Sequence, residues 1–222
     1  MATNVSEFKN LVAVDVMPCP DPIMNREVVS AILEFCQKTS VLLIDFEIDI
    51  SDETPATPQD SVDVDVSTYT SGVRPCSIHE IMVDSVRYTP RARNILTDVT
   101  YFTSQNSLDT WKFFHIVDED TVRVFDMSSD DGVIWFNMAV KPLRTATSVD
   151  DVLFEDHSEA IVAGAKWKLL SMPGKEWTDL ENALIYRQKF KKYMSAAKAR
   201  VLKGGSGGYG ESVEYKSFGE ID

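Results

Sequence analysis

The sequence predicts an α+β fold, in which a helical bundle or hairpin carries an inserted antiparallel β-rich domain and an extended C-terminal tail. Three observations predict it: a helical apolar period over residues 23–38, a twofold alternation over 42–50, and a Pro173-Gly174 turn between two later helical patterns. The chain has 222 residues, 44% of them apolar, which is enough to bury a sizeable core. The predicted parts are an N-terminal segment with the first helix (1–40), the β-rich insertion (41–145), the helical hairpin (146–203), and a linker with a tail (204–222).

The N-terminal segment ends at a run of prolines. Val12 and Val14 alternate with their neighbours, which predicts a short strand before that run. Asp21 is a suitable N-cap for the next element, because Pro22 fits the first turn of a helix. We therefore expect a helix from Ile23 to Lys38. Its apolar face, at helical spacing, consists of Val28, Ile32, Phe35 and Cys36.

Beyond Thr39 the period changes from helical to twofold. Residues 42–50 alternate apolar and acidic side chains, the pattern of a half-buried strand. The valines of residues 62–66 alternate in the same way, and the segment from Val83 to Tyr88 is predicted as a further strand.

A β-hairpin is predicted near the end of the insertion. Val122 to Phe125 and Val133 to Phe136 flank a polar run that ends in Asp131-Gly132, a pair suited to positive φ. Pro142 is expected to end the β region, because proline cannot donate to a sheet ladder.

Two helices are predicted to follow. Ser148 with Asp151 resembles a capping box for the first, and Thr178 with Glu181 for the second, which extends to about Lys203. Gly164 lies among alanines in the first helix, so we expect another helix to approach it closely. The structural residues predicted for this hairpin are Gly164, Pro173, Gly174 and Trp177.

The chain ends in a glycine-rich linker and a short polar tail. By composition Gly204 to Gly210 is a flexible linker, either native or a remnant of expression. The tail has too few apolar residues to fold by itself. Its candidates for binding a partner are Tyr209, Val213, Tyr215, Phe218 and Ile221.

Composition argues against several classes of protein. The net charge of −13 disfavours tight binding to nucleic acid, which depends on cationic neutralisation of phosphates. Cys19, Cys36 and Cys76 are widely spaced and form no C-x-x-C pair, so neither a disulfide framework nor a zinc site is expected. No leader or membrane-spanning stretch is recognisable, and we expect a soluble protein that folds in a reduced compartment.

Neither catalysis nor a cofactor is expected from the motifs. The three histidines lie far apart, and no nucleophile or metal-binding motif accompanies them. Asp45, Glu47 and Asp49 share one strand face, where calcium could bind, but a solvated face is the favoured interpretation because the necessary turn glycine is missing. The acidic run ending at Gly132 is predicted as a hairpin turn instead of a calcium loop.

The last helix differs in charge from the rest of the chain. Residues 178–203 contain seven basic and two acidic residues, a net charge of +5, which leaves −18 elsewhere. A solvated helix whose C-terminal lysines complement its dipole is one interpretation. The other is that the basic helix meets the acidic strand of a neighbouring subunit. The residues of that hypothesis are Arg187, Lys189, Lys191, Lys192, Asp45, Glu47 and Asp49.

The order of these motifs resembles the head-to-tail connector, or adaptor, family of short-tailed bacteriophages. The resemblance rests on Glu34-Phe35-Cys36, on Glu159 to Ala165, on Met172 to Trp177, and on the helix with Ala183, Tyr186 and Phe190. It is strong over residues 150–200 and weak through the β region. Thr178 stands where many members have serine, which caps a helix equally well.

The resemblance implies a structural virion protein of the neck, assembled in the host cytoplasm. Such a protein would form a ring, dodecameric in this family, that docks under the portal protein, extends the DNA channel and presents a surface to a tail protein. Family adaptors commonly anchor to the portal by a C-terminal extension, which matches residues 209–222. DNA would pass through the channel without specific binding, and Trp177 would be a packing anchor. No enzymatic activity, cofactor, metal or membrane is implied.

Two other hypotheses remain. One is a different virion ring, a tail-tube or tail-completion protein, whose main interface is the β region. The other is a small phage enzyme or carbohydrate-binding module that uses the acidic strands, which would require a cleft with carboxylates of raised pKa.

Overall fold

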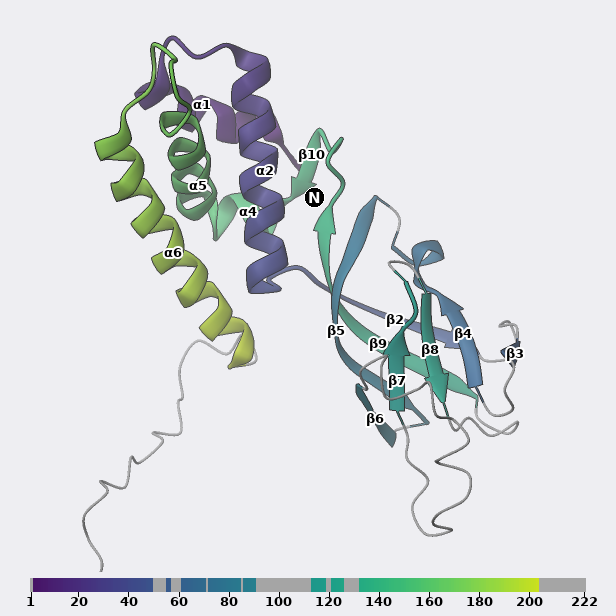
Figure 1. Cartoon of the computed structure of the whole chain (residues 1–222). Coiled ribbons are helices and arrows are strands. Elements are labelled where there is room, and N and C mark those ends of the chain that lie inside the picture. Colours follow the sequence, from purple (N-terminus) through teal and green to yellow (C-terminus); the bar gives the residue numbers. More distant parts are fainter. Residues whose placement is uncertain are drawn as a thin grey trace, which may run out of the picture.

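The structure, a computed structural model, describes residues 2–49, 55–56, 61–70, 72–84, 86–90, 113–118, 121–125 and 132–203. The chain forms a helical body and a β-rich body, which are joined by two crossings of the chain (Figure 1). The predicted α+β class is confirmed. The tail residues proposed for partner binding, Tyr209 to Ile221, lie outside the described residues.

The helical body is built around α5 (Ser158–Leu170), which packs against α1 (Val5–Val16), α2 (Asp21–Thr39), α4 (Asp151–Glu155) and α6 (Leu180–Leu202). Small residues make this central position possible, because Ala160, Ala163, Gly164 and Ala165 are all buried and let neighbouring backbones approach. The helices share one hydrophobic core. The helix predicted from Ile23 to Lys38 is confirmed as α2, with Pro22 in its first turn. The predicted N-cap is wrong, because Asp21 is the first helical residue and the N-cap is Pro20, which makes no side-chain cap hydrogen bond.

The predicted strand at Val12 and Val14 is wrong, because both residues lie in α1. Asn4 caps that helix by accepting a hydrogen bond from the backbone N–H of Ser6 at 2.9 Å. The buried residues of α1 are Val5, Phe8, Val12 and Val16. Val12 therefore belongs to a buried helical face, whereas Val14 is exposed, and over so few residues the two valines looked like alternation. The N-terminal strand is β1 (Ala2–Asn4), which pairs with β10 (Ser148–Asp150).

The β-rich body is an eight-stranded sheet that folds around its own core. Its strands, in the spatial order β2-β9-β5-β6-β7-β8-β4-β3, are all antiparallel except for the parallel pair β6 and β7. A 3₁₀ turn, Val66–Thr68, follows β4. The bounds in chain order are β2 Leu43–Asp49, β3 Pro55–Ala56, β4 Ser61–Asp65, β5 Val73–Val83, β6 Val86–Pro90, β7 Phe113–Ile116, β8 Thr121–Phe125 and β9 Val133–Pro142.

Two β predictions need correction. The strand expected from Val83 to Tyr88 is interrupted at Asp84, whose φ of 44° turns the chain from β5 into β6. The hairpin between the two segments flanking Asp131-Gly132 does not form either. β8 pairs with β4 and β7, whereas β9 pairs with β2 and β5, so each strand already has two other partners. Gly132 has no positive φ, and Asp131 lies outside the described residues.

The caps of the later helices also differ from the predicted ones. Ser148 belongs to β10, and Asp150 caps α4 by accepting a hydrogen bond from the backbone N–H of Val152. Asp179, not Thr178, caps α6, through the N–H of Asn182 at 3.0 Å. Both corrections move the cap to an aspartate, a residue type that caps as well as serine or threonine does.

The two bodies are coupled at their junction. α2 packs against β9, and the side chain of Leu42 packs against both hydrophobic cores. The backbone N–H of Val140 donates to the carbonyl of Leu42 at 2.9 Å.

Candidate functional site

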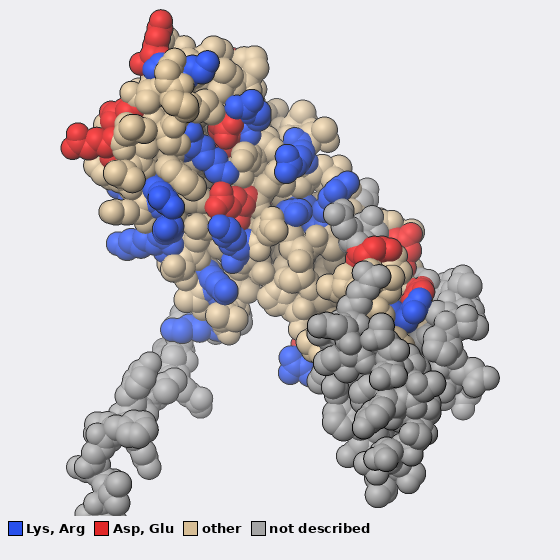
Figure 2. Space-filling model, in the orientation of Figure 1, with Lys and Arg blue, Asp and Glu red and all other residues tan. Residues whose placement is uncertain are grey.

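The outer surface of α6 is basic. Figure 2 shows Lys and Arg gathered over the α6 side of the helical body. Arg187, Lys189, Lys191 and Lys192 are all exposed there. The guanidinium of Arg187 lies 5.5 Å from the ring centre of Trp167 on α5, which fixes one charge by a cation–π contact. At Arg187 the basic surface therefore contacts both helices of the α5–α6 hairpin.

Large apolar side chains interrupt this basic surface. Leu180, Leu184 and Ile185 in the first turns of α6 and Leu202 at its end are exposed, with Leu184 at 59% and Leu202 at 75%. Leu180, Leu184, Arg187 and Lys191 follow one another at spacings of three and four, so they share one outer stripe. An exposed stripe that is both apolar and cationic is typical of an interaction surface.

A polar cluster that sequence reasoning missed holds α1 against the hairpin. Asp15 on α1 accepts a hydrogen bond from the ammonium of Lys166 on α5 at 2.7 Å and one from the hydroxyl of Tyr186 on α6 at 2.7 Å. These two bonds lower the pKa of the Asp15 carboxyl, and the bond to Asp15 raises the pKa of Tyr186 to about 12. Because Asp15 lies 151 residues from Lys166, no local pattern announces the cluster.

The acidic face of β2 lies on the β-rich body. Asp45, Glu47 and Asp49 are exposed, as the alternation predicts. Asp45 accepts a hydrogen bond from the amide of Asn137 on β9 at 2.6 Å, and Glu47 is the register partner of the half-buried Trp135. β2 is the end strand of the sheet, where charges also discourage unwanted edge pairing.

The basic and acidic surfaces do not pair with each other within the chain. Among the described residues, no ion pair joins Arg187, Lys189, Lys191 or Lys192 of α6 to Asp45, Glu47 or Asp49 of β2.

The close approach predicted at Gly164 is confirmed. A Cβ atom built on Gly164 would lie 2.8 Å from Cε2 of Phe190 on α6. Phe190 is fully buried, and its ring centre lies 6.1 Å from that of Trp167 and 6.3 Å from that of Phe35. Glycine is required here by packing, because its helical backbone is ordinary.

The turn of the hairpin brings together the remaining structural residues. α5 ends at Leu170, and Gly174 has a φ of 69°, the left-handed conformation that favours glycine. Thr178 closes the turn, because its hydroxyl donates to the carbonyl of Met172 and accepts from the N–H of Lys175. Pro173 and Gly174 are exposed in this turn.

Trp177 packs half-buried against the helical core. Its indole Nε1 is buried and has no hydrogen-bond acceptor among the described residues. A buried indole that makes no such bond contributes through packing, which agrees with a role as the anchor of the turn.

The described histidines and potential metal ligands lie apart from one another. No group of three or more potential metal ligands occurs in the described part of the chain. His79 lies on β5, His115 on β7 and His157 at the start of α5, in three separate elements. Burial lowers the pKa of His157, whose ring packs on Phe35 with centres 5.0 Å apart. No described helix is long and apolar enough to cross a membrane.

No family model matches the sequence, and no curated protein is similar to it at the threshold of significance.

Proposed function

We propose that this chain is the subunit of a head-to-tail adaptor ring of a short-tailed bacteriophage. The observation that supports this proposal best is the pair of oppositely charged surfaces, one on each body, that do not meet within a single chain. A contact between two different patches on identical subunits is heterologous and generates a ring when its rotation closes. The motifs of the α5–α6 hairpin supply the resemblance to adaptors.

The two surfaces match in more than charge. The outer stripe of α6 offers Leu184, Arg187 and Lys191, and the outer face of the sheet offers Glu47 beside Trp135. Interfaces concentrate their binding energy in tryptophan and arginine at the centre, with charged groups at the rim giving orientation and rate. In this proposal α6 of one subunit lies across β2 and β9 of the next.

The overall charge suits a channel for DNA. Outside residues 178–203 the net charge is −18, and a wall with few cations releases few counterions from DNA. The genome would therefore slide through such a ring without being held.

The tail is proposed to bind the portal protein. Tyr209, Tyr215 and Phe218 supply aromatic side chains on a segment with too little apolar content to form a core of its own. Burial of these rings in a partner would offset the entropic cost of ordering the segment. This part of the proposal rests on sequence alone.

A charge-swap experiment tests the ring. The purified protein, alone and mixed with portal, is measured by light scattering after gel filtration and by negative-stain imaging. Lys191→Glu should abolish or weaken the ring, and Glu47→Lys in the same chain should restore it in part. Lys175→Glu, in the exposed hairpin turn, is the matched control and should assemble normally.

Three results bear against this proposal. A chain that stays monomeric with and without portal would refute the ring. Rings that form equally well with Lys191→Glu would place the subunit contact elsewhere. Binding to a tail protein but never to portal would favour the tail-completion alternative.

A further inference from the structure

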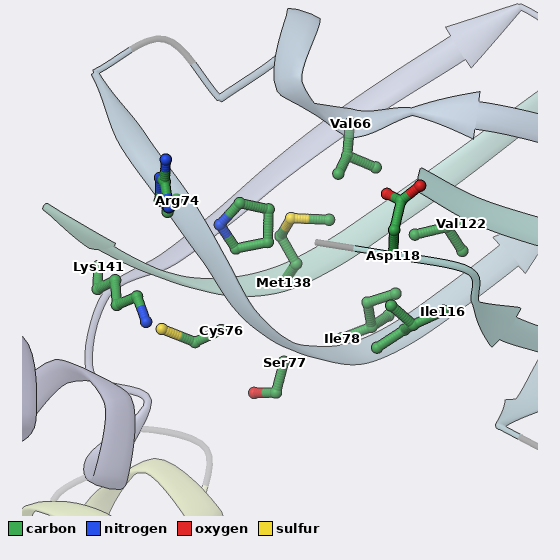
Figure 3. Close-up of a pocket in the computed structure, with 11 residues that line it drawn as sticks. Val66, Arg74, Cys76, Ser77, Ile78, Ile116, Asp118, Val122, Met138 and Lys141 are labelled. Atoms are coloured by element: carbon green, nitrogen blue, oxygen red, sulfur yellow. The ribbon is translucent and has the colours of Figure 1, made fainter. Parts of the chain in front are cut away.

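A cavity of about 460 Å³ opens in the β-rich body, away from the charged surfaces described above. Its walls come from β5, from β9, from the 3₁₀ turn after β4, and from the ends of β7 and β8 (Figure 3). Interiors of proteins are close-packed, and cavities of this size are typical of sites that hold a ligand.

A β-bulge creates this cavity. Pro75 pairs with Val140 and Ser77 pairs with Ala139, so Cys76 is the extra residue on β5. The five consecutive residues 74–78 all line the cavity, which a regular strand, with alternating side chains, does not allow. Bulges commonly re-aim side chains beside functional sites.

The sheet is also open at this point. β6 pairs with β5 only from Ile81 to Val83, so within the described residues no strand pairs with the other edge of β5 at residues 74–78. Pro75 fits such an edge, because it has no N–H to donate. Among the described strands, the cavity is therefore bordered by an unpaired edge of β5.

The floor of the cavity is apolar. Val66, Val122 and Met138 are buried core residues, and the half-buried Ile78 continues this surface. A hydrocarbon or aromatic group of moderate size would find its contacts here.

The charges are distributed unevenly along the cavity. Lys141 and Arg74 are register partners on adjacent strands and lie at one end, whereas Asp118 lies at the other (Figure 3). Lys141 is half-buried, extends toward the sulfur of Cys76, and makes no ion pair or hydrogen bond with another described residue. The half-buried ammonium of Lys141 therefore favours an anionic group at this end of the cavity.

At the opposite end of the cavity, one oxygen of Asp118 accepts a hydrogen bond from the backbone N–H of Thr121 at 2.8 Å, which holds the carboxylate in place.

We propose that this cavity binds an apolar carboxylate, with the hydrocarbon part on Val66, Val122 and Met138 and the carboxylate on Lys141. The ligand could be a free small acid or an acidic residue beside an aromatic one in a protein segment. Both present the same chemistry. This inference does not depend on the adaptor function.

Cys76 provides a native reporter for the test. It is half-buried in the cavity wall, whereas Cys19 and Cys36 are buried, so a thiol reagent should modify Cys76 first. The probes are 3-phenylpropionate and the capped peptide acetyl-Glu-Phe-amide. Their neutral controls are 3-phenylpropanamide and acetyl-Gln-Phe-amide. We expect the carboxylates, and not the amides, to slow modification of Cys76 severalfold at saturation.

The variant Lys141→Gln separates a specific site from general crowding. It should weaken binding of the carboxylates about tenfold while protection at saturation remains. Because the substitution also changes the reactivity of Cys76, each variant is compared with itself without ligand, and calorimetry gives a second measure of affinity. Protection by the acid alone identifies a small-molecule site, and protection by the peptide identifies a site for a protein segment.

The inference is overturned by either of two results. One is that carboxylates protect Cys76 of the wild-type protein no better than the matched amides. The other is that a folded Lys141→Gln protein binds the carboxylates with unchanged affinity.

Discussion

Gly164→Ala opposes two effects of similar size, so it tests the packing of the hairpin sharply. Alanine is favoured over glycine in a helix by about 1 kcal/mol. The added methyl would, however, lie 2.8 Å from Cε2 and 3.0 Å from Cδ2 and Cζ of Phe190, where carbon atoms prefer about 3.5 to 4.0 Å. The ring of Phe190 is fully buried, so it cannot move aside into solvent without leaving the core. Since overpacking costs about 1 to 3 kcal/mol, we expect a net loss of about 1 kcal/mol.

Denaturant unfolding monitored by circular dichroism measures this loss. Ala196→Gly, at an exposed position of α6, is the matched control and should lose about 1 kcal/mol through propensity alone. In a double-mutant cycle, Phe190→Leu should reduce the cost of Gly164→Ala, because it removes ring atoms that clash. If Gly164→Ala is as stable as the wild-type protein or more so, the close-packing argument is wrong.

Three further predictions concern stability. The pKa of Asp15 is lowered in the folded state, so its contribution to stability is present above its unfolded pKa and is lost as pH falls through the folded value. Asp15→Asn should therefore reduce the change of melting temperature with pH between pH 5 and 2, and an unchanged slope would refute this. Burial lowers the pKa of His157, so protonation favours the unfolded state and stability should fall as pH drops below about 6.5. His157→Phe should remove that decrease in thermal scans from pH 8 to 5, and a decrease that persists would show that another group causes it. Thr178→Ala should lower the free energy of unfolding by about 1 kcal/mol because the hydroxyl bridges Met172 and Lys175, whereas Thr178→Ser should retain most of this stability. Equal losses in chemical denaturation would show that the methyl group matters instead.

Local patterns in the sequence determined several elements of this protein. These elements are the helical period of α2, the alternation of β2 and the Pro173-Gly174 turn. Each depends only on residues close to it in the sequence, so the pattern is visible in the sequence itself. The exposure of the acidic β2 residues and the basic character of α6 follow from the same patterns. The glycine at 164 also announced a close contact, because an interior helical glycine is costly without one.

Only the tertiary structure decided which elements meet. The segments of β8 and β9 look like a hairpin, yet each lies between two other strands, since the pairing of both edges of each strand outweighs a local turn signal. Val12 and Val14 fit either period, and the helix is selected by the packing of α1 against α5, with Val12 buried and Val14 exposed. The Asp15 cluster joins residues more than 150 positions apart, and the cavity beside Lys141 depends on a bulge in β5 and an open sheet edge. Such features arise from contacts between segments that are distant in the sequence. The free energy of these contacts depends on both segments, so it cannot be inferred from either segment alone.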